Sequence, residues 1–306
     1  MEDWIPKIEN AGSSIEAHLG FAVAQYNAGD YEKALLEAGD VLRRDARNAE
    51  AMLLIARVNY DRGQFDEARK RCDEAAVCDP KSGKPHLLLA IIHHETSRDR
   101  EATDAAQKSV DADPGNASAW QQLGIFCGET GEWNRAEKAF REALKLNPQL
   151  AQSYRQLAKI HHDRGDHARA FEELRSSLLI NPSNPATRLT LGDVYLSTGQ
   201  PEKAIEEYRE SFRLNPNSEH GCIKAGQVYL KLGRLADALF EFRQALAIRG
   251  ANEEAQFGLG QVYLALKQYG PAIQQFEAVL KSNANHDGAL KGKIAAEAAR
   301  AAPAAA

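Results

Sequence analysis

The central stretch of the chain reads, from Ala117 to Leu150, ASAWQQLGIFCGETGEWNRAEKAFREALKLNPQL. Its apolar residues recur three and four positions apart, which predicts helices with one buried face. Gly131 interrupts the pattern, because a residue free to take positive φ lets one helix turn back as the next. Pro148, after Asn147, ends the second helix, since proline lacks an N–H and clashes with the preceding turn. The stretch therefore predicts a pair of helices.

The same pattern returns every 34 residues over most of the chain. Alanine holds one position of the second helix eight times without an insertion, at Ala34, Ala68, Ala102, Ala136, Ala170, Ala204, Ala238 and Ala272. A small residue holds the eighth place of each unit, where the first helix must approach the second closely, as Ala22, Ala56, Ala90, Gly124, Ala158, Gly192, Gly226 and Gly260. Such a period means that one small structural unit is copied in tandem and stacked. We therefore expect an all-α array.

The unit resembles the tetratricopeptide repeat family, whose motif runs W-x2-L-G-x2-Y, then A-x3-F, then P. The unit that begins at Ala117 matches at Trp120, Leu123, Gly124, Ala136, Phe140 and Pro148, and has Cys127 where the tyrosine stands. The resemblance covers eight predicted repeats, residues 15–48, 49–82, 83–116, 117–150, 151–184, 185–218, 219–252 and 253–286. It implies a right-handed superhelical solenoid of helix-turn-helix repeats whose first helices line a concave wall.

Departures from the motif are local and affect only the expected helix ends. Ser97 and Lys267 replace the turn glycine of their repeats, and Gly250 and Ala284 replace the closing proline. Both ends of the chain are atypical, as the ends of arrays are. Residues 1–14 are expected to be an N-terminal cap segment, with apolar Trp4, Ile5 and Ile8 and with Ser13 or Ser14 capping the next helix.

The chain end predicts one more helix and a tail. Residues 287–300 are expected to form a C-terminal capping helix, apolar at Leu290 and Ile294 and charged at Lys291, Lys293 and Arg300, as a lid over the last repeat requires. Residues 301–306 have no pattern to bury and are expected to be a disordered tail.

Composition limits the classes of function. The 306 residues are 43% hydrophobic and 26% charged, and the net charge of −5 argues against nucleic-acid binding, which uses dense Lys and Arg. No segment approaches the roughly 18 consecutive apolar residues of a transmembrane helix, so no membrane insertion is expected. The start, Met1-Glu2-Asp3-Trp4, lacks the basic and then apolar run of a secretory signal, and a cytoplasmic location is expected.

Three cysteines and most of the clustered histidines, which are residue types used in catalysis and metal binding, fall on helix-packing positions. Cys72, Cys127 and Cys222 fall on helix-packing places, and no CxxC pair exists. Histidines cluster at His161, His162 and His167 and at His86, His93 and His94, but most hold places that aromatic residues hold in other repeats. No HExxH spacing, phosphate loop or nucleophile elbow is present. We predict no catalytic residue, no metal and no cofactor, and thus a protein that is not an enzyme.

The concave wall suggests the binding site. The resemblance implies inward residues at the second, fifth, sixth, ninth, twelfth and thirteenth places of each repeat. In repeats four to seven the predicted partner-binding residues are long and polar: Gln121, Gln122, Gln152, Arg155, Gln156, Lys159, Arg188 and Lys224. Such donors hold main-chain carbonyls and carboxylates, which predicts an acidic or C-terminal peptide as the ligand. The alternative is a solvated polar wall that binds nothing.

Repeats one to three are mostly apolar on the same wall. A secondary apolar groove is predicted at Tyr26, Leu53, Tyr60, Leu87, Ile91 and His94. It suits an amphipathic segment, the chain's own first 14 residues or a second subunit, and packing between adjacent helices is the competing interpretation.

Function is therefore expected at the surface. The sequence favours a non-catalytic scaffold or adaptor that binds a peptide segment of a partner protein in the concave groove. The alternative is a self-assembling structural protein that forms homo-oligomers.

Overall fold

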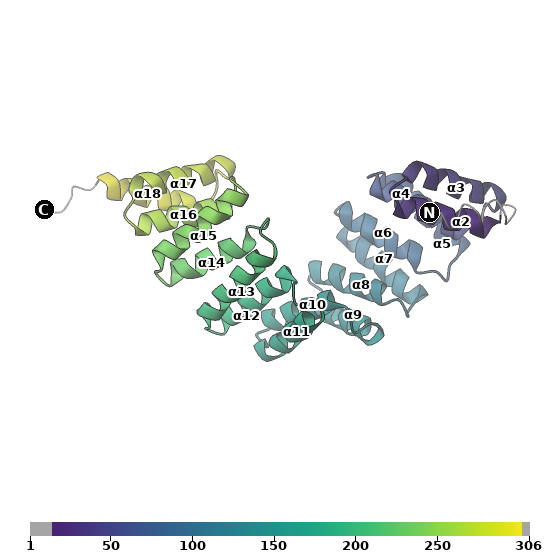
Figure 1. Ribbon diagram of the computed structural model, residues 1–306, viewed down its shortest axis with the longest axis horizontal. Helices are drawn as coiled ribbons and strands as arrows, with labels where there is room; N and C mark the ends of the chain where they lie inside the picture. The colour runs from purple at the N-terminus through teal and green to yellow at the C-terminus, as the bar shows by residue number, and fades with distance from the viewer. Residues whose placement is uncertain (1–13, 302–306) are drawn as a thin grey trace. The chain divides into compact units, whose positions relative to one another are not determined.

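The computed structural model describes residues 14–301, and this part of the chain holds 17 α-helices and no β-strand (Figure 1). The first helices of the pairs are α2 (Ile15–Asn27), α4 (Ala49–Asp61), α6 (Lys84–Glu95), α8 (Ala117–Glu129), α10 (Ala151–Asp163), α12 (Pro185–Ser197), α14 (His220–Lys231) and α16 (Glu253–Ala265). The second helices are α3 (Tyr31–Arg44), α5 (Phe65–Cys78), α7 (Asp99–Ala112), α9 (Trp133–Leu146), α11 (His167–Ile180), α13 (Pro201–Leu214), α15 (Leu235–Ile248) and α17 (Tyr269–Ser282), and α18 (Asp287–Ala301) follows. The all-α class of packed helix pairs is confirmed.

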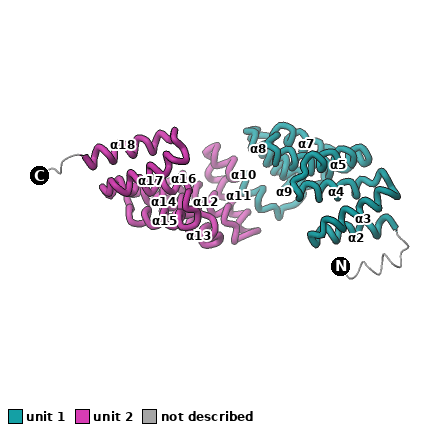
Figure 2. The backbone as a smooth tube through the Cα atoms, turned by 90° about the horizontal axis from the view of Figure 1, so that it is seen from above, with its two compact units in different colours: residues 1–156 teal, residues 157–306 magenta. Residues whose placement is uncertain are grey.

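The chain divides into two compact units, residues 1–156 and residues 157–306 (Figure 2). From α2 to α9 in the first unit, and from α11 to α18 in the second, each helix packs against the next. First helices of successive repeats also contact one another, as α2, α4, α6 and α8 do in the first unit and α14 and α16 do in the second. Within each unit, the described second helices of successive repeats contact one another less than the first helices do. The first helices therefore line the tighter side of each unit.

The predicted helix ends are found, including those where the motif departs. Each Asx-Pro step directly follows a second helix, as Asn147-Pro148 follows α9. The helices α15 and α17 end at the equivalent residues, Ile248 and Ser282, although no proline follows in their repeats. At the start of the array, Ser14 caps α2, because its hydroxyl accepts a hydrogen bond from the backbone N–H of Ala17 at 3.1 Å. The other predicted N-terminal residues, Trp4, Ile5 and Ile8, lie outside the described residues.

The turn within each pair needs left-handed backbone. Glycine supplies it at six turns, where φ lies between 71° and 78°. Ser97 and Lys267 adopt the same conformation, with φ of 56° and 59°. These two repeats thus keep the same turn geometry as the others and pay a steric cost that glycine avoids, because an L-residue in this region crowds its Cβ against the backbone.

Packing inside each pair depends on matched residue sizes. All eight alanines of the 34-residue period are fully buried. Where the eighth place is glycine, an aromatic ring of the second helix fills the space. A Cβ on Gly124 would lie 2.7 Å from the Phe140 ring, and one on Gly192 would lie 2.4 Å from Tyr208. Where the eighth place is alanine, the facing residue is smaller: Ala38, Cys72, Ala106 and Leu174.

The contacts of α18 differ from the prediction. The helix forms and extends through Ala301, but Leu290 and Ile294 are 48% and 57% exposed. Its packing face consists of small residues instead, with Ala289 and Ala296 fully buried. A Cβ on Gly292 would lie 2.6 Å from the ring of Phe276, so the helix axis is too close to α17 for larger side chains. Residues 302–306 of the predicted tail lie outside the described residues.

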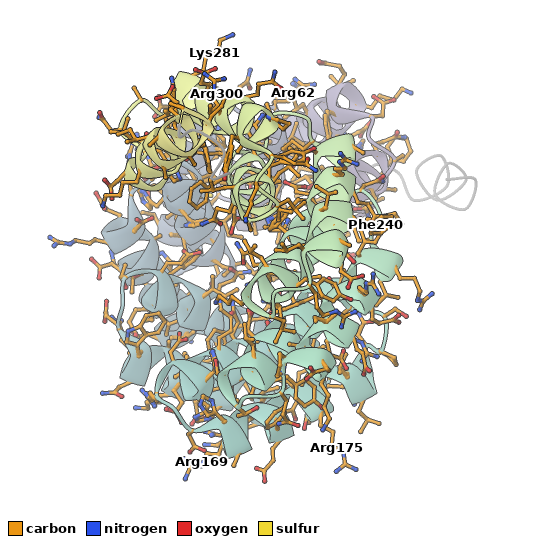
Figure 3. All side chains as sticks on the ribbon, turned by 90° about the vertical axis from the view of Figure 1, so that its left-hand side faces the viewer. Arg62, Arg169, Arg175, Phe240, Lys281 and Arg300 are labelled. Atoms are coloured by element: carbon orange, nitrogen blue, oxygen red, sulfur yellow. The ribbon has the colours of Figure 1, made fainter. Side chains whose placement is uncertain are left out.

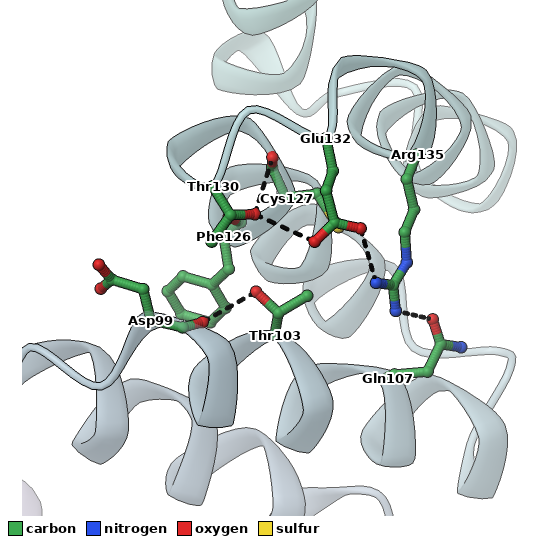
Figure 4. Close-up of polar contacts among 8 residues, drawn as sticks. All are labelled: Asp99, Thr103, Gln107, Phe126, Cys127, Thr130, Glu132 and Arg135. Atoms are coloured by element: carbon green, nitrogen blue, oxygen red, sulfur yellow. Dashed lines mark hydrogen bonds and ion pairs between the residues drawn. The ribbon is translucent and has the colours of Figure 1, made fainter.

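Polar side chains join successive pairs as well. Arg135, in the first turn of α9, donates to Gln107 of α7 at 2.8 Å and to Glu132 at 3.0 Å (Figure 4). Thr130 closes the C-terminal turn of α8 by donating to the carbonyl oxygens of Phe126 and Cys127. Arg135 is therefore occupied in structural contacts between repeats.

Candidate functional site

The polar residues predicted in the first unit lie on α8 and on the start of α10. The side-chain amide of Gln121 donates to the Ser153 hydroxyl at 3.0 Å, which links the two first helices. Gln122 and Gln156 are half-buried, and Gln152 is exposed. These amides offer donors and acceptors at the surface, and Gln121 is already engaged in joining its repeat to the next.

Arg155 is the unusual member of this group. Its side chain is half-buried, and its Nε is buried without a hydrogen-bond partner. Burial lowers the pKa of Arg155, because desolvation disfavours the charged form. Within residues 14–301 no carboxylate is paired with it. A guanidinium remains charged in proteins, so Arg155 is a cation that lacks its counter-ion.

The polar residues predicted in the second unit are compensated more fully. Lys224 forms an ion pair with Asp193 at 2.8 Å, and the Tyr208 hydroxyl donates to the same carboxylate oxygen at 2.7 Å. Arg188 donates to Glu207 of α13 at 2.9 Å. Arg188 holds the fourth place of its repeat, which is not an inward place, and this explains why it meets its own second helix.

Lys159, which the sequence also predicts, is exposed on α10 in the second unit. The pocket found on the first helices of this unit is not among the predicted sites. It occupies about 490 Å³ and is lined by Gln227, Leu230, Lys231, Glu254, Phe257, Gly258 and Gln261. All seven residues hold inward places of α14 and α16. The repeat register could therefore have predicted this pocket from the sequence.

The apolar groove predicted in the first unit is partly core. Leu53 is 6% exposed and packs between helices. Leu87 and Ile91 are half-buried. Tyr26 and Tyr60 are half-buried too, and each ring contacts the first aromatic residue of its second helix with centroids 5.9 Å apart. Only part of the predicted set is therefore available to a partner.

A series of contacts that we did not predict follows the same edge. Burial, together with the carboxylate of Asp61 in the next repeat, raises the pKa of Tyr26 to about 12. Burial and the nearby Glu95 raise the pKa of Tyr60. Nδ1 of His94 lies 3.3 Å from Oε2 of Glu129. Each pair is separated by 35 residues, a spacing that is visible in the sequence.

Of the histidines predicted to pack, His161 is buried, and His86, His93 and His167 are half-buried. His161 is 2% exposed, and its Nε2 lies 4.0 Å from Glu173. The one group of three ligand-type residues within the described residues was not predicted; it consists of His18, Glu37 and Asp40. Nδ1 of His18 lies 2.6 Å from Glu37, and Asp40 pairs with Arg43. His18 and Glu37 therefore pair with each other and Asp40 pairs within its own helix, while Nε2 of His18 has no hydrogen-bond partner among the described residues.

One aromatic side chain is prominent on a second helix. Phe240 of α15 is 57% exposed (Figure 3). With Leu239 and Arg243 it helps to line a shallow pocket of about 370 Å³. Since all the lining residues belong to α15, this surface is separate from the first-helix face.

Comparison with known families agrees with this architecture. Two family models described as tetratricopeptide repeat match the sequence, one over residues 19–83 and 128–185 and the other over residues 161–221 and 229–296. The chain belongs to the tetratricopeptide repeat family. The family fold is typical of protein-interaction scaffolds, and members are generally non-catalytic. The division into eight repeats with the stated bounds stays a prediction.

Solved structures share the tetratricopeptide repeat fold at low identity. The crystal structure of the APC/C hetero-tetramer Cut9–Hcn1 has a TM-score of 0.66 and 21% identity, and the match covers 96% of this chain and 58% of that chain. Yeast Tom70 has a TM-score of 0.60 and 17% identity, over 88% of this chain and 60% of that chain. PilW, a type IV pilus biogenesis factor, has a TM-score of 0.62 and 18% identity, over 69% of this chain and 98% of that chain.

These likenesses show the fold alone. The chain spans less than two thirds of the Cut9–Hcn1 and Tom70 chains that it matches. No curated protein matches the sequence. None of the described helices is both long and apolar enough to cross a membrane.

Proposed function

We propose that this tetratricopeptide repeat protein is a non-catalytic scaffold that binds an acidic or C-terminal peptide segment of a partner protein on the first helices of its first unit. The observation that carries the proposal is Arg155, a half-buried guanidinium whose Nε has no hydrogen-bond partner and which has no paired carboxylate in the described chain. A carboxylate ligand supplies the missing counter-ion, and a guanidinium binds it through two parallel hydrogen bonds.

Neighbouring amides support an extended ligand. Gln122, Gln152 and Gln156 lie on the same helices, α8 and α10, and no hydrogen bond with another described side chain occupies them. Amide side chains both donate and accept, so they can hold the main chain of a peptide without selecting its side chains. The charge at Arg155 would then set the preference for a carboxylate, and the amides would set the orientation.

The test measures fluorescence anisotropy of a labelled ten-residue peptide of alternating glutamate and alanine, offered to the intact chain with a free C-terminus or as an amide. Arg155→Glu should weaken binding by at least about tenfold, because it removes a desolvated charge pair and adds a repulsion. Arg169→Glu on α11 is the matched control; that side chain is 64% exposed and already pairs with Asp166. Figure 3 shows its position.

The outcomes separate the forms of the proposal. Tighter binding of the free C-terminus than of the amide identifies a terminal carboxylate, whereas equal binding identifies acidic side chains as the ligand. Failure of both peptides to bind, or an equal loss with Arg155→Glu and Arg169→Glu, would refute the site at Arg155. Circular dichroism of each variant confirms that helical content is retained.

Self-assembly remains a second candidate because of α18. Leu290 and Ile294 are exposed one helical turn apart, and exposed apolar side chains at this spacing suit packing against another helix. Sedimentation of the intact chain over a range of concentrations tests this. An oligomer that Ile294→Ser dissociates would support assembly through α18, and a monomer at every concentration would exclude it.

A further inference from the structure

A pocket at the first repeat has a chemistry opposite to that of the Arg155 site. It occupies about 480 Å³, a volume within the range of natural ligand pockets. Its apolar surface comes from α2, where Leu19, Val23 and Ala24 line it, and Val23 is 41% exposed. Glu16 and Glu50 also line it, so carboxylates border an apolar floor.

The two carboxylates are weakly neutralised. Glu16 has no ion pair or side-chain hydrogen bond with any residue in the described range 14–301. Glu50 has only Lys84 nearby, at 3.6 Å between two exposed groups, and such pairs contribute little. By contrast, Glu37 on the neighbouring α3 is held at 2.6 Å by His18. The charge at the pocket is therefore available to a ligand.

Two further carboxylates lie on the first helices of the same unit, where the exposed Arg57 of α4 is the nearby cation. Asp61 and Glu95, at the C-terminal ends of α4 and α6, are exposed, and no lysine or arginine of the described chain is paired with them. Burial, together with the negative charge of these carboxylates, raises the pKa values of Tyr26 and Tyr60. An incoming basic chain thus meets carboxylates at the pocket and beyond it.

We infer that the first-repeat pocket binds a basic partner segment in which an aliphatic side chain is flanked by lysine or arginine. The aliphatic group packs on Leu19, Val23 and Ala24, and the flanking cations pair with Glu16 and Glu50. Charge complementarity selects this ligand over an acidic one, because a carboxylate placed between Glu16 and Glu50 is repelled by both. This inference concerns a different surface from Arg155 and holds whether or not the acidic site exists.

The test uses anisotropy of a labelled peptide, Lys-Arg-Leu-Leu-Arg-Lys, with the intact chain at low and high salt. Two reference peptides replace the leucines by serine or the cations by glutamate. The double variant Glu16→Gln with Glu50→Gln should weaken binding roughly fivefold or more, since each exposed pair contributes up to about one factor of five. Val23→Ser should weaken it through lost apolar contact and leave the salt dependence unchanged.

Asp66→Asn is the matched control, because that carboxylate is 92% exposed on α5 of the same unit and lies away from the pocket. Arg155→Glu separates this inference from the acidic site and should leave the basic peptide bound. Equal binding of the glutamate peptide, or equal losses from Asp66→Asn and the double variant, would overturn the inference.

Two other occupants of the pocket give distinct results. If the basic peptide binds only after Trp4, Ile5 and Ile8 are changed to serine, the chain's own N-terminal segment fills the pocket and the inference fails. If the intact chain forms a dimer that Val23→Ser dissociates, a second copy fills it and the inference fails as well.

Discussion

The strongest structural prediction concerns the size match between the eighth place of a repeat and the second helix that faces it. In repeat four the pair is Gly124 and Phe140, and a Cβ at Gly124 would lie 2.7 Å from two atoms of the ring. Normal carbon contacts begin near 3.4 Å. Phe140 is 2% exposed, so its ring cannot move aside without disturbing the core around it. Gly124→Ala must therefore strain the pair.

The expected magnitude is a balance of two effects. Overpacking of a filled core destabilises the fold by about 1 to 3 kcal/mol, whereas replacing glycine by alanine inside a helix stabilises it by about 1 kcal/mol. Gly124→Ala should therefore lower the free energy of unfolding by about 1 kcal/mol. Phe140→Leu, which removes part of a buried ring, should cost about 1 to 2 kcal/mol by itself.

The double variant tests whether the effects at Gly124 and Phe140 are coupled. Repeat five already carries the pair Ala158 and Leu174, both fully buried, so Gly124→Ala with Phe140→Leu recreates a combination that the fold accepts. The double variant should be no less stable than Phe140→Leu alone, which gives a coupling energy of about 1 kcal/mol or more.

Urea denaturation followed by circular dichroism measures these differences. Hydrogen exchange of the α8 and α9 amides localises them, because a repeat array need not unfold as one unit. Strictly additive effects of Gly124→Ala and Phe140→Leu would refute the size match. Increased stability of Gly124→Ala alone would show that the ring moves aside without cost.

Four single positions test the left-handed turns, the half-buried His93 imidazole and the thiols. Ser97 and Lys267 adopt φ of 56° and 59°, a region that glycine enters without strain. Ser97→Gly and Lys267→Gly should therefore each raise the free energy of unfolding by about 0.5 to 1 kcal/mol, measured as a higher urea midpoint. A lowered midpoint would contradict the strain. Burial lowers the pKa of His93 below its ordinary 6.5, so the fold favours the neutral ring. The stabilisation is complete above pH 6.5 and falls as the pH drops below that value, and His93→Gln should flatten the dependence of Tm on pH between about 7 and 5. An unchanged dependence would remove His93 as its source. Ellman's reagent should modify one thiol rapidly in the native chain, and Cys78→Ser should abolish that reaction, because burial raises the pKa of the other three thiols: Cys72 to about 12, Cys127 to about 11 and Cys222 to about 12. Rapid modification of more than one thiol would count against this assignment.

The helices and their ends follow from the sequence because the interactions that decide them are local and periodic. The glycine turns show the strength of this periodicity, since the flanking repeats hold Ser97 and Lys267 in a conformation that these residues disfavour alone. The same reason explains why α15 and α17 end at the expected residues without a proline.

Side-chain pairing between helices follows less directly. The register shows that Lys224 lies on an inward place, but it does not show that Asp193, 31 residues earlier, reaches the ammonium group. Leu290 and Ile294 form an apolar pattern within α18, yet the close approach of α18 to Phe276 admits only small residues at the contact. Both outcomes depend on distances between helix axes, which the periodicity of one helix does not contain.

These pairings change how the polar wall is interpreted. A count of long polar side chains ranks Lys224 and Arg155 as equivalent, but their free energies of binding a carboxylate differ. For Lys224 a ligand must displace Asp193 at 2.8 Å, so one ion pair replaces another and the net gain is small. Arg155 has already lost much of its hydration and gains a partner that it lacks. Between these two cations, we therefore expect a carboxylate ligand to bind at Arg155 rather than at Lys224.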